Sequence, residues 1–170
     1  MTTSPLTDAF AHHAWATLRL IDACSELSDE QLATAVPGIY GSILDTMRHL
    51  VESDSWYLFV ISEGAHQPME DAESLALPEL RSAMERQGEA WARLLETEID
   101  PGRVLVRRRD DGSETHAPLG VRLAQVVHHG TDHRSQVCTA LTSLGVEPPW
   151  IDVWAYAEAS GLSTEVPPRS

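Results

Sequence analysis

Apolar side chains recur every three or four residues in four long segments of this chain, and that spacing is typical of amphipathic α-helices. The four segments are 8–27, 42–64, 78–97 and 119–144. Proline and glycine lie between the segments, where helices begin and end. Because four amphipathic helices bury their apolar stripes against one another, the sequence predicts an all-α protein built as a four-helix bundle.

Two shorter elements complete the expected fold. Residues 103–116 hold two short strand patterns around an Asp-Gly turn, which predicts a small β-hairpin insertion between the third and fourth helices. Residues 151–160 predict a short C-terminal helix. Neither a repeat nor a flexible linker interrupts the pattern, so we expect residues 1–170 to form a single domain.

The charge of the chain excludes several classes of function. The sequence has 26 acidic and 12 basic residues, a net charge of −14, and such a surface repels phosphate backbones and anionic lipids. We therefore expect no nucleic-acid partner and no membrane partner. Every basic residue is arginine, which excludes a mechanism that needs a lysine Schiff base.

The cysteines and the N-terminus indicate a cytoplasmic protein. Cys24 and Cys138 form no CxxC motif, and two distant cysteines fit a reducing compartment better than a disulfide scaffold. The first residues lack the basic and apolar stretches of a secretory signal. We expect both cysteines to be small core residues.

Eight histidines are many for 170 residues, and one pair among them is informative. His129 and His133 are four residues apart in the fourth helix, so their rings point the same way, about 6 Å apart along the axis. Gly130 takes the position of the glutamate in an HExxH motif, which removes the general base of a metalloprotease. A glycine inside a helix is costly, and close approach of another segment or of a ligand would explain it.

His49 lies midway along the second helix, at the height where a facing helix would present the histidine pair. Three histidines with one open position are the pattern of catalytic zinc sites, whereas structural zinc sites have four protein ligands. The alternative is that the three side chains make ordinary hydrogen bonds on helix faces. His66 and His116 are expected to be solvated, and either His12 or His13 is a candidate to line a pocket.

Several motifs resemble the DinB/YfiT-like metalloproteins. Residues 128–136, His-His-Gly-Thr-Asp-His-Arg-Ser-Gln, resemble the motif of that family's last helix, although Ser135 replaces its usual glycine. Residues 44–51, together with Asp54 and Trp56, are similar to the motif of its second helix. The opening segment, the hairpin and residues 151–156 also match, so the resemblance covers nearly the whole chain.

The resemblance implies a bundle that binds a divalent metal, Zn²⁺ or Ni²⁺, through His49, His129 and His133. Several members of the family are thiol S-transferases that use bacillithiol, mycothiol or glutathione, and a related family isomerises maleylpyruvate with mycothiol. The expected partners are thus a small thiol and an electrophilic small molecule, and a homodimer is compatible with the resemblance. Candidate pocket residues around the metal are His13, Asp45, Trp56, Arg134 and Gln136.

Three functions follow from these residues. The leading hypothesis is a metal-dependent S-transferase that conjugates a low-molecular-weight thiol to an electrophile, with Arg48 and Arg134 as candidates to hold an anionic thiol. The second is a metal-dependent hydrolase, which needs a carboxylate base; the candidates are Asp45, Glu52 and Asp132. The third is a non-catalytic metal-binding stress protein, which a closed four-ligand site would favour. The sequence alone assigns no catalytic residue.

Overall fold

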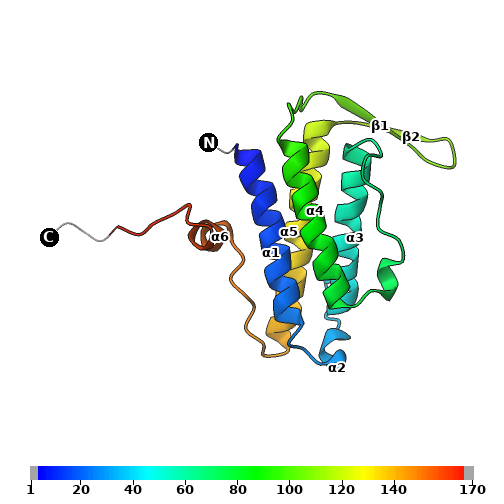
Figure 1. Ribbon diagram of the computed structural model, residues 1–170. Helices are drawn as coiled ribbons and strands as arrows, with labels where there is room; N and C mark the ends of the chain where they lie inside the picture. The colour runs from blue at the N-terminus through cyan, green and yellow to red at the C-terminus, as the bar shows by residue number, and fades with distance from the viewer. Residues whose placement is uncertain (1–3, 167–170) are drawn as a thin grey trace.

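The computed structural model describes residues 4–166 and confirms the predicted four-helix bundle. Four long helices run side by side, as Figure 1 shows. They are α1 (Pro5–Cys24), α3 (Ile43–Ile61), α4 (Leu77–Leu95) and α5 (Leu119–Ser143). Among the described residues, no helix has the length and apolar character needed to cross a bilayer.

The helices form a closed ring in which each contacts two neighbours. α1 packs against α4 and α5, and α3 packs against the same two helices from the other side. In Figure 1, α1 and α5 run down the page while α3 and α4 run up. A segment that includes a single 3-10 turn, η1 (Ala72–Ser74), therefore returns along the bundle from the end of α3 to the start of α4.

Side-chain caps explain where three of the helices begin. Ser42 precedes α3, and its hydroxyl accepts the Asp45 N–H while the Asp45 carboxylate accepts the Ser42 N–H. The same box starts the short helix α2 (Asp29–Leu32) at Ser28. α1 begins earlier than the apolar pattern predicts, because Ser4 caps it and Pro5 suits its first turn.

The two short elements form at the predicted places. Strands β1 (Val104–Arg108) and β2 (Glu114–Pro118) are antiparallel and lead directly into α5. Gly112 takes a φ of +80° in the turn, a conformation that glycine adopts without strain. Helix α6 (Val153–Ala159) lies beside α1, where a ring nitrogen of His12 hydrogen-bonds the Ile151 carbonyl.

The core consists of two apolar clusters, with buried polar side chains between them along α1, α3 and α5. One cluster includes Leu20, Met47, Leu80 and Val137, one from each long helix. The other includes Phe10, Leu58, Trp91 and Val126, again one from each. Four buried polar residues lie between the two clusters in sequence on α1, α3 and α5: His13, Thr17, Asp54 and Arg134.

Candidate metal centre

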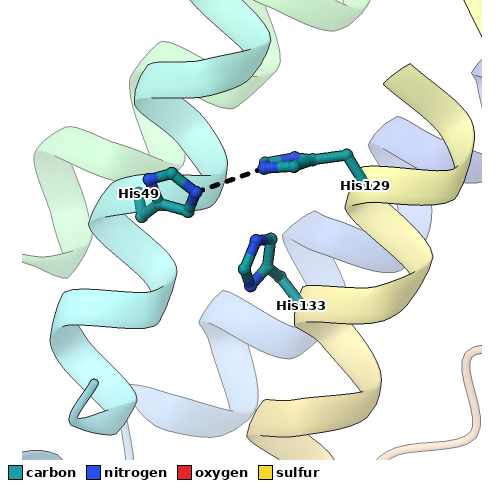
Figure 2. Close-up of side chains that lie close together, drawn as sticks. All are labelled: His49, His129 and His133. Atoms are coloured by element: carbon teal, nitrogen blue, oxygen red, sulfur yellow. Dashed lines mark hydrogen bonds between the residues drawn. The ribbon is translucent and has the colours of Figure 1, made fainter. Parts of the chain in front are cut away.

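Three imidazole rings from two helices converge between α3 and α5. Figure 2 shows His49 on α3 facing His129 and His133, which lie one turn apart on α5. The Nε2 atoms of His49 and His129 are 3.2 Å apart, and one ligand atom from each of the three rings lies within 4.8 Å of the others. The structure therefore brings together the three histidines that the sequence singled out.

The donor set fits a divalent transition metal. Two nitrogens that each lie about 2.0–2.1 Å from a tetrahedral zinc ion are about 3.3 Å apart, close to the 3.2 Å between His49 and His129. Imidazole nitrogen suits zinc and nickel alike. In the part of the chain that the structure describes, no fourth His, Cys, Asp or Glu joins the cluster, so these three could hold an ion and leave a position open.

The surroundings of His129 and His49 favour the neutral form of these two imidazoles. Burial, followed by the neighbouring His133 and His49 rings, lowers the pKa of His129 to about 4. Burial and the His133 ring also lower the pKa of His49. A histidine binds a metal only when the coordinating nitrogen carries no proton, so both shifts favour the ligand form near neutral pH.

We expect the metal-free protein to lose stability as the pH falls from about 6.5 toward 4. The ordinary pKa of His129 is 6.5 and the folded value is about 4, so the unfolded chain binds more protons between these two values. Lowering the pH therefore favours unfolding across this window. Urea titrations of the chelated protein from pH 7 to pH 4 measure the effect. A His129→Gln variant should give a shallower dependence; equal slopes would contradict the shift.

Gln136 fixes the orientation of His133. The backbone N–H of Tyr40 donates to Gln136 Oε1 at 3.0 Å, and this identifies the atom as the amide oxygen. The same oxygen lies 3.1 Å from His133 Nδ1, which must then carry the proton and donate it. Nε2 is left without a proton, so Gln136 selects the tautomer in which His133 can bind a metal through Nε2.

Replacing Gln136 by leucine is expected to weaken metal binding by about 10–100-fold, the usual effect of losing such an orienting hydrogen bond. Gln136→Glu replaces the amide oxygen by a carboxylate oxygen that can accept from both donors, so its metal affinity should stay close to that of the native protein. Competition with a chromophoric chelator measures both affinities. Equal affinity in the leucine variant would show that the orientation of His133 does not depend on this contact.

Two tyrosines contact the triad. The Tyr40 ring stacks on His49 with centroids 4.0 Å apart and planes 12° from parallel, and Tyr57 meets His129 at 5.6 Å. Tyr57 lies on the apolar stripe of α3, and this position in the sequence favours an inward-facing side chain. Tyr40 precedes α3 in a loop, and no periodicity in the sequence indicates that it covers His49.

A cavity of about 540 Å³ adjoins His49, and charged side chains from α3 line it. Asp45 is engaged there in capping α3: its hydrogen bonds with Ser42 lower its pKa. Arg48 donates from Nε to the Leu75 carbonyl. Glu52 also lines the cavity and is exposed. Asp132 is exposed on α5.

The remaining candidates lie farther from the cavity. Arg134 is 3% exposed and donates to His13 and Thr17, so it is not placed to hold an anionic thiol in an open pocket. His13 is also buried. The Trp56 ring packs under Arg107 of the hairpin, 4.6 Å from its guanidinium carbon, rather than against the triad.

Two of the histidines with no expected role lie outside the triad. His66 follows α3, where its backbone N–H donates to Ser62. A ring nitrogen of His116 on β2 lies 2.8 Å from the Glu114 carboxylate in an exposed pair. Neither belongs to the group that could hold a metal ion.

Comparisons with known proteins identify the family and support the fold. The model of the DinB family matches residues 1–168. The fold is similar to a solved structure described as "YfiT from Bacillus subtilis is a probable metal-dependent hydrolase with an unusual four-helix bundle topology". That likeness has a TM-score of 0.64 at 18% identity and covers 86% of this chain and 92% of the other, and it concerns the fold. No curated protein matches the chain in sequence. Since the family model spans nearly every residue, the chain belongs to the DinB family.

Proposed function

We propose that this protein is a metal-dependent S-transferase that conjugates a low-molecular-weight thiol to an electrophilic small molecule. The observation that carries the proposal is the group of three histidines with no fourth ligand among the described residues, beside a cavity of about 540 Å³. When bound there, Zn²⁺ or Ni²⁺ is a Lewis acid that lowers the pKa of a thiol or of a water molecule. A closed site with four protein ligands would favour a non-catalytic metal protein. Residues 4–166 form no such site.

The chain itself supplies position and shelter. His49, His129 and His133 would hold the ion, and Gln136 orients His133. Tyr40 stacks on the His49 ring, and Tyr57 packs against the His129 ring in an edge contact. The cavity beside His49 offers a place for the organic part of a thiol such as mycothiol, bacillithiol or glutathione.

The carboxylates of Asp45 and Asp54 are already engaged, which favours thiol transfer over hydrolysis. A hydrolase needs a general base near the reacting water. Asp45 is a poor base because its hydrogen bonds with Ser42 lower its pKa. The buried Asp54 carboxylate already accepts from His13 and Trp91. A thiol whose pKa is lowered by a bound metal needs no such base.

Metal-dependent hydrolysis is the second candidate, and Glu52 is the residue that favours it. Its exposed carboxylate lines the cavity beside His49, and no hydrogen bond or ion pair engages it in the described structure. The description of YfiT as a probable metal-dependent hydrolase, although it concerns a protein of 18% identity, points to the same reaction class. Glu52→Gln separates the two functions, because it should abolish hydrolysis and leave thiol transfer intact.

The test is a parallel assay of protein loaded with Zn²⁺ or Ni²⁺. One arm follows consumption of mycothiol, bacillithiol, glutathione and cysteine with a model electrophile, and the other follows hydrolysis of esters and amides. We expect thiol consumption that chelation removes and added metal restores. Hydrolysis without thiol consumption, lost in Glu52→Gln, would overturn the transferase assignment in favour of the hydrolase.

A further inference from the structure

The bundle carries a charged chain of hydrogen bonds in its interior, next to the triad in sequence. Arg134 follows His133 on α5, His13 comes from α1 and Asp54 from α3. Their exposed fractions are 3%, 1% and 2%. None of the three belongs to the group that could hold a metal ion, so the function proposed above does not explain them.

The hydrogen bonds join all four long helices and converge on the Asp54 carboxylate. Arg134 Nη1 donates to His13 Nδ1 at 3.0 Å, so Nδ1 carries no proton and Nε2 does. His13 Nε2 then donates to Asp54 Oδ1 at 3.0 Å. The other oxygen, Oδ2, accepts from Trp91 Nε1 on α4 at 2.9 Å. Thr17 Oγ1 adds a second acceptor for Arg134 Nη1 at 3.1 Å. We call these five residues the buried network.

Gly130 makes room for the buried network directly beside a triad histidine. A Cβ atom at this position would lie 2.3 Å from His13 Cε1 and 2.8 Å from Arg134 Nη1. No side chain fits there unless His13 moves, which accounts for a glycine in the middle of α5. The His13 ring of α1 thus packs against α5 at Gly130, one residue from His129.

Stability alone is a poor explanation for such a network. Burying a guanidinium and a carboxylate costs about as much as their attraction returns, and apolar side chains of similar volume often stabilise a core at least as well. Buried polar groups have another consequence, because sliding one helix along another would leave a charge without its partner. The buried network therefore favours a single register among the four helices.

The register of α3 and α5 decides where the ligand nitrogens lie. One residue of shift moves a side chain about 100° around its helix and about 1.5 Å along it. Asp54 fixes α3 five residues after His49, and Arg134 fixes α5 one residue after His133. The 3.2 Å between the Nε2 atoms of His49 and His129 leaves little room for such a shift.

We propose that the buried network positions the metal ligands: it holds α3 and α5 in the register in which the three imidazoles converge before an ion binds. His13 is the central positioning residue, because it alone contacts both charged members. The inference rests on the proposed metal centre and extends it to residues that touch neither metal nor substrate.

Two variants of His13 test the inference with Co²⁺ as the metal probe. His13→Leu removes both hydrogen bonds, and we expect about 10–100-fold weaker Co²⁺ binding together with an altered visible absorption spectrum, which reports the geometry of the ligands. His13→Gln can accept from Arg134 and donate to Asp54 through one amide, and it should recover most of the affinity and the native spectrum. Affinity is measured against a competing chelator in the full chain.

Leu80→Ala is the matched control for lost stability. Leu80 is fully buried on α4, which carries no triad residue, so this variant should unfold at lower urea yet keep the Co²⁺ affinity and spectrum. Thr17→Val is a milder second variant that removes one acceptor from Arg134 and should weaken Co²⁺ binding less than His13→Leu does.

Native Co²⁺ affinity and spectrum in both His13→Leu and Thr17→Val would overturn the inference. If His13→Leu does not fold, native binding by Thr17→Val overturns it alone. Loss of affinity in Leu80→Ala equal to that in His13→Leu would also overturn it, because stability would then account for both. A native protein that takes up no Co²⁺ would instead remove the metal centre itself.

Discussion

Alanine in place of His133 is expected to reduce the metal content from near one ion per chain to a small fraction of that value. His133 is one of three nitrogen donors, and two remaining imidazoles cannot complete a site of this kind. Single alanine variants at His49 and His129 should show the same loss. Elemental analysis of protein purified without chelators, for zinc and nickel together, measures the content.

Two histidines outside the triad serve as controls. His66→Ala and His116→Ala should retain the native metal content, since neither residue belongs to the cluster. If His49→Ala also retained it, α3 would contribute no ligand and the convergence of α3 and α5 would have another purpose. Equal loss in all five variants would point to adventitious binding by surface imidazoles.

The parts of this fold that depend on local patterns could be predicted from the sequence. The stripes of apolar residues predicted the four long helices, and the Asp-Gly turn predicted the hairpin. The pairing of His129 with His133 is also local, because one helical turn separates them. For Gly130, the sequence predicted the close approach of another segment or of a ligand. The structure shows that the segment is α1, whose His13 ring lies beside this glycine.

The family resemblance implied one contact between distant segments, that of His49 with the histidine pair on α5, but the other such contacts could not be predicted. His13 meets Arg134 from 121 residues away, and Tyr40 meets Gln136 from 96 residues away. Separations of this length follow no helical or strand repeat, so a single sequence does not reveal these contacts. Arg134 illustrates the difficulty: next to His133 in sequence, it looked like a pocket residue, yet adjacent helix positions diverge by about 100° and its side chain enters the core.

The surroundings of the buried Cys24 and the half-buried Cys138 bear on the source of the sulfur in the proposed reaction. Burial raises the pKa of the Cys24 thiol to about 12, with a further contribution from Cys138. Burial also raises the pKa of Cys138, although the nearby Arg134 opposes the shift. Because the thiolate is the nucleophile, neither side chain is suited to attack an electrophile at neutral pH.

We therefore expect Cys24→Ser and Cys138→Ser to retain metal-dependent thiol transfer, while His133→Ala reduces it to the uncatalysed rate. The sulfur then comes from a free thiol, and only the triad histidine is needed to activate it. Initial rates with each thiol of the panel, measured on the metal-reconstituted variants, give the comparison. Serine at Cys24 places a hydroxyl in a fully buried apolar cluster, so its rate is compared at a temperature where circular dichroism shows the variant folded. A folded Cys138→Ser protein that lost activity along with His133→Ala would assign the nucleophile to the chain and contradict transfer from a free thiol.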